Sequence, residues 1–358
     1  TTAFREAGYF VHGSGKIYHE SYRRREEWDD YLDKERGDPR PAAGQSDGVG
    51  GIKFGPVDAR DNELSDWGIA DYGIASLQRK HDKPFFLAVG FHKPHMPWHV
   101  PRKWFDLFPL ESIKLPPYLE NDLDDLPPAA VRMAHPETDH VPMQKSGRWK
   151  EAIQAYLATI AYCDMNLGRL LDAFEKSAYR DNTIICLWGD HGWHLGEKHH
   201  WRKFALWEEA TKAPFMWVVP GVTKPNTLCE RTVDFMSIFP TLTELCGIPT
   251  PAHNEGVSIR RLLADPKAPW DLPARTTYKF NNHTVRSEGW RYIRYANGDE
   301  ELYDEAKDPN EWTNLAAQPG FAARKAELAA FLPKTNAPDP SERAPKEERQ
   351  AKKRKKDD

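Results

Sequence analysis

The sequence of 358 residues contains no run of 18 consecutive apolar residues, and only four of its residues are cysteines. The first absence excludes a membrane-spanning helix within this segment, because such a helix needs about 20 apolar residues. The cysteines are scattered, and two of them lie in apolar segments, so neither a disulfide framework nor a zinc site is expected. The body of the chain also lacks a basic patch, so we expect no nucleic-acid partner there.

The composition is that of a globular protein with a charged end. Hydrophobic residues make up 39% of the chain, enough to bury a large core, and 13 tryptophans supply flat side chains that can line pockets. Residues 341–358 hold eight Lys and Arg against five Asp and Glu, so this end carries +3 and the rest of the chain −7. Its basic run 352–356 is compatible with a nuclear or nucleic-acid address, but a solvated tail is the simpler interpretation.

Two kinds of hydrophobic pattern predict the core. The runs 84–91, 183–188 and 214–219 are apolar without alternation, which is typical of strands covered on both faces. Residues 150–177 repeat apolar side chains at helical spacing. The face of this helix that we expect to be buried comprises Ile153, Leu157, Ile160, Leu167, Leu171 and Phe174. Because strand, long helix and strand make a βαβ unit, the predicted fold class is α/β, with a mostly parallel central sheet flanked by helices.

The pattern changes after Gly256. Segments 277–280, 284–286 and 290–295 alternate between apolar and polar residues and are separated by Asn-Asn, Glu-Gly and Asn-Gly-Asp turns. Alternation with such turns is typical of antiparallel hairpins. We therefore expect a small antiparallel sheet in this part of the chain.

These patterns predict three parts: an α/β core at 1–256, an antiparallel sheet subdomain at 257–332 and a disordered charged tail at 333–358. Within the core, the proline-rich segment 101–142 lacks sustained periodicity. We interpret it as a surface excursion near the site.

The stretch 188–203 carries the densest polar chemistry. Asp190 and His191 follow a predicted strand directly, between two glycines that let the backbone turn sharply. Ligands of open α/β sheets bind beyond the carboxyl ends of strands, so the pair lies where a bound cation or anion would sit, and Lys203 can add positive charge nearby. An isolated Asp-His pair is more often a turn carboxylate beside a hydrogen-bonded histidine, so the dipeptide alone does not decide.

Histidines gather in two short windows, which hold seven of the 14. The first window spans residues 92–99 and the second spans residues 191–200. His92 is the strongest single candidate, because it leaves the predicted strand 84–91 at the same sheet edge as Asp190.

The string Gly-Asp-His-Gly-Trp-His-Leu-Gly-Glu and the Trp-Arg-Lys that follows it, within residues 189–203, resemble the C-terminal metal motif of the sulfatase family, in the alkaline-phosphatase-like superfamily. The iduronate-2-sulfatase-like branch is the most similar. Gly-Lys-Ile-Tyr-His at 15–19, His-Lys-Pro-His at 92–95 and residues 301–315 resemble further family segments. The resemblance covers roughly residues 1 to 332.

The resemblance implies a metal centre and an unusual nucleophile. Asp190 and His191 would ligate a divalent cation, which is Ca²⁺ in most relatives. Lys16 and His19 would support the hydrate of a formylglycine residue. Carboxylate oxygen suits Ca²⁺, whereas imidazole nitrogen is a less typical ligand of that ion.

The substrate implied by the resemblance is a sulfated sugar or polysaccharide. His92 and Lys203 would bind the sulfate or protonate its leaving oxygen, and His95 would be a further substrate contact. A sulfate ester develops negative charge on its oxygens during hydrolysis, so a cationic Lys, a protonated His and a hard cation would stabilise its transition state.

One departure from the family is serious. The family's nucleophile is a Cys or Ser in a Cys/Ser-x-Pro-x-Arg motif, which a formylglycine-generating enzyme converts, and this motif does not occur in the sequence. The N-terminal strand with paired aspartates that completes the family's metal site is absent as well. We therefore expect the chain to be the C-terminal part of a longer enzyme, inactive alone. The resemblance implies a periplasmic, lysosomal or secreted location, although no signal peptide is present in this chain.

Two other functions stay open. One is a phosphoesterase or phosphonate hydrolase of the same superfamily, with Thr or Ser as nucleophile. The other is a carbohydrate-binding relative that kept the fold and lost catalysis. The sequence upstream of Thr1 would discriminate between them and a sulfatase.

Overall fold

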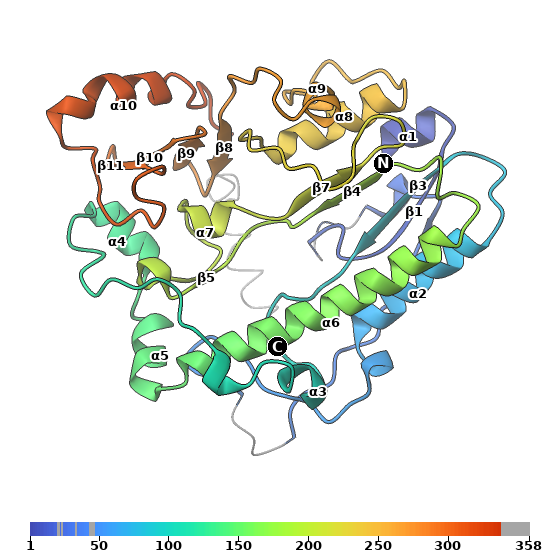
Figure 1. Ribbon diagram of the computed structural model, residues 1–358, viewed down its shortest axis with the longest axis horizontal. Helices are drawn as coiled ribbons and strands as arrows, with labels where there is room; N and C mark the ends of the chain where they lie inside the picture. The colour runs from blue at the N-terminus through green and yellow to red at the C-terminus, as the bar shows by residue number, and fades with distance from the viewer. Residues whose placement is uncertain (20–21, 23, 33, 43–46, 338–358) are drawn as a thin grey trace, which may run out of the picture.

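The computed structural model describes residues 1–337 except 20–21, 23, 33 and 43–46, so most of the predicted tail and its basic run lie outside the described residues. Figure 1 shows a pair of long helices along one side, strands in the middle and a small separate sheet beside them. The shorter elements are α1 (Thr2–Glu6), η2 (Arg25–Glu27), η3 (Asp61–Glu63), β5 (His194–Leu195), η5 (Glu197–His199), β6 (Trp201–Arg202), α7 (Glu208–Thr211), η6 (Phe235–Ser237), α8 (Ile238–Leu245), α9 (Arg260–Ala264) and η7 (Pro319–Phe321).

A parallel three-stranded sheet forms one half of the centre. It consists of β1 (Phe10–Gly15), β2 (Asp30–Tyr31) and β3 (Phe85–Gly90) in the order β2-β1-β3. At Gly13 in the middle strand, a Cβ atom would lie 2.8 Å from both the Ala88 carbonyl oxygen and the Trp28 ring. Only glycine therefore allows Trp28 to pack against this strand.

Two antiparallel strands form the other half, namely β4 (Ile185–Trp188) and β7 (Phe215–Val218). The parallel sheet confirms the predicted fold class, but the expectation that residues 214–219 close a parallel βαβ unit is wrong, because β7 pairs with β4 in the opposite direction. Full coverage of both faces is also not found among the described residues. Met216 and Val218 are 55% and 53% exposed, and every residue of β3 is only half-buried.

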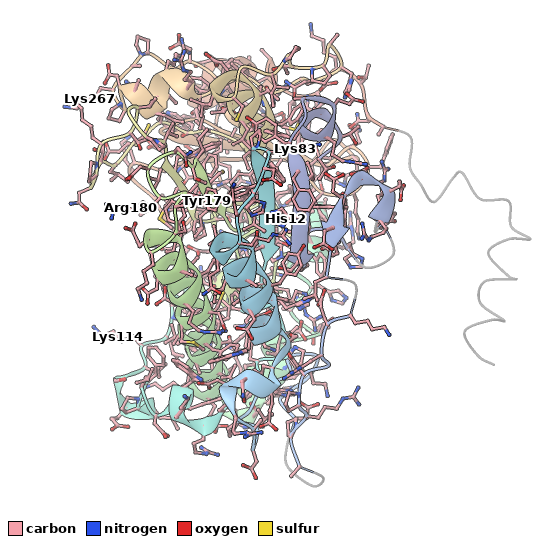
Figure 2. All side chains as sticks on the ribbon, turned by 90° about the vertical axis from the view of Figure 1, so that its right-hand side faces the viewer. His12, Lys83, Lys114, Tyr179, Arg180 and Lys267 are labelled. Atoms are coloured by element: carbon pink, nitrogen blue, oxygen red, sulfur yellow. The ribbon has the colours of Figure 1, made fainter. Side chains whose placement is uncertain are left out.

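Helices α2 (Ser65–Gln78) and α6 (Trp149–Glu175) lie side by side, and α2 covers β1 and β3 (Figure 2). The long helix confirms the prediction for 150–177, but part of the predicted buried face is wrong, since Ile160 and Leu171 are 38% and 36% exposed. The buried face instead contains small residues. A Cβ at Gly73 of α2 would lie 2.8 Å from Leu170 of α6, so the close approach of the helices depends on small side chains.

The proline-rich segment 101–142 is part of the core rather than a surface excursion. It contains α3 (Arg102–Phe105), η4 (Leu110–Ser112), α4 (Pro128–Ala134) and the start of α5 (His140–Ser146). Its buried apolar side chains join two hydrophobic clusters, one on α6 and one beneath the C-terminal sheet. These side chains are isolated between prolines and turns, so their burial leaves no periodic pattern in the sequence. The buried residues are Phe105, Ile113, Leu126, Ala130 and Ala134.

The predicted C-terminal antiparallel sheet is confirmed. It contains β8 (Ala274–Thr277), β9 (His283–Arg286), β10 (Trp290–Arg294) and β11 (Glu300–Asp304) in the order β11-β10-β9-β8. Helix α10 (Ala322–Ala329) packs on one face through Leu328. The boundaries 257 and 332 stay a prediction.

His140 of α5 is an acid-sensitive part of this core. It is 1% exposed, its ring stacks on His199 at 4.9 Å, and its Nδ1 accepts a hydrogen bond from Trp201 Nε1 at 3.4 Å. Burial, together with the nearby charge of His199, lowers the pKa of His140 from 6.5 to about 4. The neutral ring is therefore favoured in the folded state, and its contribution to stability is lost as the pH falls from 6.5 towards 4.

Replacement of His140 by Phe should make the protein less sensitive to acid. Phe keeps the stacked ring but cannot be protonated, so the free energy of unfolding should fall by about 2 kcal/mol less between pH 7.5 and pH 5 than in the parent protein. Chemical denaturation at both pH values measures the difference. The same change at exposed His253 serves as control. Equal pH slopes for His140→Phe and the parent protein would show that this ring is not protonated on unfolding.

Candidate active site

A loop fixed by backbone contacts follows β4. Gly189 N–H donates to the Pro214 carbonyl at 3.0 Å, and Gly192 N–H donates to the Ala210 carbonyl at 2.9 Å. A Cβ at Gly192 would lie 2.0 Å from the Glu209 carbonyl oxygen, so glycine is required there. The two anchors hold Asp190 and His191 at the carboxyl end of β4, as the sequence predicts.

Lys16 reaches this loop from the parallel sheet. It directly follows β1, and its backbone N–H donates to the Gly90 carbonyl of β3 at 2.7 Å. Its ammonium lies 2.8 Å from Asp190 Oδ2. Burial by itself raises the pKa of Asp190, but the hydrogen bond from Lys16 and the positive charges around it bring that pKa below its usual value. The carboxylate is therefore ionised at neutral pH.

His191 presents a nitrogen suited to metal binding. Its Nδ1 lies 2.7 Å from its acceptor, the Gly192 carbonyl oxygen, and its Nε2 lies 3.4 Å from Asp190 Oδ1. This Nε2 is buried and has no hydrogen-bond partner among the described residues. Burial lowers the pKa of His191, which favours the neutral ring that binds metals.

His95 and Lys203 complete a cluster of polar side chains around Asp190. Burial is the main cause that lowers the pKa of His95, and the charges of Lys203 and Lys16 lower it further. Burial and Lys16 likewise lower the pKa of Lys203, while Asp190 acts in the opposite direction. These mutual effects place the side chains within electrostatic reach of one another. One carboxylate among two lysines and two histidines favours an anionic ligand.

Two predicted residues have other partners. The Nε2 of His92 lies 2.6 Å from Glu35 Oε2, and its backbone N–H donates to Asp66 at 2.7 Å. The bond to Glu35 is the main cause that raises the pKa of His92. His19 is exposed, and its ring lies 6.4 Å from that of Tyr22. Of the predicted residues, the structure therefore groups Lys16, His95, Asp190, His191 and Lys203.

Sequence reasoning missed Glu35, which binds His92 from a loop far away in the sequence. It also missed Trp193, whose ring lies 6.4 Å from His95 and 6.3 Å from His191. Trp193 is inside the motif at 188–203, so its position could have marked it. Nothing in the sequence around Glu35 distinguishes it from other surface carboxylates.

The fold around this cluster is that of the alkaline-phosphatase-like hydrolases. A structure solved with its substrate D-glucosamine-2-N,6-O-disulfate has a TM-score of 0.69 to this chain at 21% identity, over 92% of this chain and 80% of that one. A phosphonate monoester hydrolase of Agrobacterium radiobacter has a TM-score of 0.77 at 20% identity, over 92% and 78%. At these identities the likeness establishes the fold alone.

The sequence comparisons define the family. Residues 2–248 match the sulfatase family, and residues 196–337 match the C-terminal part of N-sulphoglucosamine sulphohydrolase. The chain belongs to the sulfatase family. A sulfatase of Formosa agariphila is 44% identical over 291 residues, which is 79% of this chain and 56% of the relative. Iduronate 2-sulfatase of Mus musculus is 29% identical over 300 residues, which is 69% and 54%. The chain thus spans about half the length of these relatives.

The donor atoms at the loop after β4 fit part of a metal site. Asp190 supplies carboxylate oxygens, and His191 supplies the unpartnered Nε2 described above. Within the part of the chain that the structure describes, no group of three or more His, Cys, Asp or Glu side chains could hold a metal ion. The two residues therefore fit a cation only together with further ligands. Likewise, no helix within the described ranges is both long and apolar enough to traverse a bilayer.

Proposed function

We propose that the protein hydrolyses sulfate esters on a sulfated sugar or polysaccharide. The proposal depends on the proximity of four groups that follow four different strands. Lys16 follows β1, His95 follows β3, the Asp190-His191 pair follows β4, and Lys203 follows β6. Relatives with sugar substrates support it: an N-acetylglucosamine-6-O-sulfatase of Bacteroides thetaiotaomicron is 29% identical over 217 residues, 55% of this chain and 39% of the relative.

The cluster has the charges that this reaction needs. Lys16 and Lys203 stabilise negative charge that grows on the sulfate oxygens. His95, rather than the predicted His92, is the nearer candidate to protonate the leaving oxygen, because His92 is paired with Glu35. His92 then acts as a positioning residue for the loop that carries His95. A bound anion raises the pKa of His95 and so restores the proton that burial disfavours.

Asp190 and His191 would hold a divalent cation, for which we retain Ca²⁺. The cation supplies positive charge to a sulfate oxygen when bound. Asp190 also positions Lys16 through their 2.8 Å contact, so the carboxylate serves two partners.

The proposed nucleophile is a formylglycine made by a formylglycine-generating enzyme, in the part of the relatives' length that this chain does not span. The partly exposed β3, β4 and β7 support the proposal that further strands cover them in the complete enzyme. Lys16 and His19 would support the hydrated aldehyde. A periplasmic, lysosomal or secreted location belongs to the same proposal.

Phosphonate monoester hydrolysis is the second candidate, because a phosphonate monoester hydrolase shares the fold at a TM-score of 0.77. Both functions are tested by assaying an activated aryl sulfate and an aryl phosphonate monoester. The polypeptide of the complete reading frame is coexpressed with a formylglycine-generating enzyme, and residues 1–358 are assayed alongside. We expect the complete polypeptide to hydrolyse the aryl sulfate and residues 1–358 to show no turnover. A preference for the phosphonate would favour the second candidate, and turnover by residues 1–358 would refute the proposed nucleophile.

The assignment of the proton donor predicts a difference between two histidines. In the complete polypeptide, His95→Ala should lower kcat on an unactivated sugar sulfate by about 10²–10⁴-fold, and on an activated aryl sulfate by much less. His92→Ala is the matched control on the same loop. It should lower kcat by a similar factor on the two substrates, and by less than His95→Ala lowers kcat on the sugar sulfate. If His92→Ala shows the leaving-group dependence instead, the role belongs to His92.

A further inference from the structure

A line of two aromatic rings with a lysine at each end leads away from the cluster. Lys203 Nζ lies 5.7 Å from the centre of the Phe204 ring, and the Phe204 ring lies 5.9 Å from the Tyr278 ring at an angle of 30°. Lys279 Nζ lies 5.3 Å from the centre of the Tyr278 ring. We call these four residues the aromatic strip. It connects the candidate active site to the turn between β8 and β9 of the C-terminal sheet.

The aromatic strip is partly exposed to solvent and is supported by buried residues. Phe204 is 44% exposed, although the next three residues, Ala205, Leu206 and Trp207, are buried. Tyr278 is half-buried against the hydrophobic cluster that contains those three residues. An exposed ring beside a half-buried one, tilted by 30° from it, gives an apolar surface that the cluster beneath Tyr278 supports.

Lys279 occupies an unfavourable backbone conformation. Its φ of +59° lies in the left-handed region, which a long side chain rarely adopts, whereas Asn and Gly adopt it readily. The turn that follows does not depend on the ammonium, because Asn282 Nδ2 donates to the Tyr278 and Phe280 carbonyls at 3.1 and 3.0 Å. A lysine at this strained position therefore calls for a role of its charge outside the turn.

We propose that the aromatic strip binds a second sugar ring, next to the one that carries the scissile sulfate, and that Lys279 binds an anionic group on that ring. This inference rests on the proposed function and narrows its substrate to an oligosaccharide of at least two rings. The apolar face of a pyranose matches the exposed face of Phe204. Lysines at both ends of the strip match negative groups on successive rings.

The test compares substrates that do and do not reach the strip. Phe204→Ala and Lys279→Asn are made in the complete polypeptide, coexpressed with a formylglycine-generating enzyme. Phe204→Ala should raise KM about tenfold for a sulfated disaccharide and leave the kinetics on 4-methylumbelliferyl sulfate unchanged. Phe204→Tyr should restore the KM. Lys279→Asn should raise KM about threefold only when the second ring carries an anionic group.

A control separates binding from folding. Leu110→Ala removes an apolar side chain that is 41% exposed in η4, which packs on α6. This variant should leave the kinetics on both substrates unchanged. If Phe204→Ala lowers the Tm and impairs both substrates equally, another part of the polypeptide covers the strip and the inference is wrong. Unchanged kinetics on the disaccharide overturn it as well.

Failure of the proposed function has a different signature, because the parent polypeptide would then hydrolyse no sulfate ester at all. In that case calorimetric titration with the sulfated disaccharide still tests the strip. Weaker binding by Phe204→Ala would support it, and equal binding would refute it.

Discussion

Replacement of Arg291 by Met is expected to lower the free energy of unfolding by about 3–5 kcal/mol, because it removes the buried charge that pairs with two buried carboxylates and one half-buried carboxylate. Arg291 of β10 is completely buried and pairs with Glu208, Glu305 and Glu311. Burial raises the pKa of Glu305 and of Glu311, and Arg291 is the largest influence in the opposite direction. Without the guanidinium, Glu311 loses this ion pair and must take up a proton or remain buried as a charge, while Glu208 and Glu305 keep their ion pairs with Arg286.

The network matters because of where its members lie. Glu208 begins α7, five residues after Lys203, while Arg291 and Glu305 belong to the C-terminal sheet region. Arg291 also donates to the Leu206 carbonyl at 3.0 Å. The network thus fixes the segment that carries Lys203 and Phe204 onto the C-terminal sheet.

Chemical denaturation of the parent protein and the Arg291→Met variant tests the prediction. Arg286→Met is the matched control, since Arg286 also pairs with Glu208 and Glu305 but is 20% exposed, and its loss should cost about 1 kcal/mol. The double variant Arg291→Met with Glu311→Gln should recover part of the loss, because one buried charge is removed with its partner. A loss below about 1 kcal/mol for Arg291→Met would contradict the prediction.

Local patterns predicted the elements that depend on local rules. The continuous apolar runs became β3, β4 and β7, the helical repeat became α6, and the alternating segments 284–286 and 290–295 became β9 and β10. The segment 277–280 was misplaced, because β8 ends at Thr277, and alternation did not predict β11. Pairing direction was not predictable in the same way. Nothing within residues 214–219 states that the partner is β4 in antiparallel orientation, because that choice is made by contacts with distant parts of the chain.

In the candidate site, too, some features follow from the local sequence and others depend on residues far away in the chain. The sheet-edge rule placed Asp190 at a strand end with Lys203 nearby, and the family resemblance added Lys16, which lies 2.8 Å from Asp190 in the structure. The choice between His92 and His95 depends on the direction of each side chain after β3. The ring of His92 bonds to Glu35, which lies 57 residues earlier in the chain. A rule based on strand ends identifies the loop but not which of its histidines points into the site.

The buried face of α6 was only partly predictable, for a related reason. Hydrophobic periodicity favours large side chains as the buried ones, yet Ile160 and Leu171 are more exposed than Ala152, Ala155 and Ala158. The three alanines pack in the hydrophobic cluster that contains Trp98. At the contact with α2, the small residue is Gly73, against which Leu170 packs. Interhelical distance is not encoded in the periodicity of either helix.

Replacement of Lys16 by Ala is expected to lower sulfate ester turnover by the complete polypeptide by about 10²–10³-fold, the loss that follows from removing one positioned donor of positive charge. The contact between Lys16 and Asp190 means that the variant also affects the proposed metal ligand. Lys16 lies 2.8 Å from Asp190 Oδ2, so its loss also removes a positive charge from a carboxylate that would hold the cation. Asp190 keeps both oxygens for the metal in this variant.

The metal content of the variants therefore distinguishes the role of Lys16 from that of Asp190. Elemental analysis should find the cation retained in Lys16→Ala and lost in Asp190→Ala, although both variants lose turnover. Lys16→Arg should recover part of kcat, since it keeps the charge with a different shape. Lys53→Ala is the matched control, because Lys53 forms an ion pair of 3.2 Å with Asp47 and is 50% exposed, and its turnover should not change. Loss of the cation from Lys16→Ala would show that Lys16 supports the metal ligand rather than the sulfate. Normal turnover by this variant would show that Lys16 has neither role.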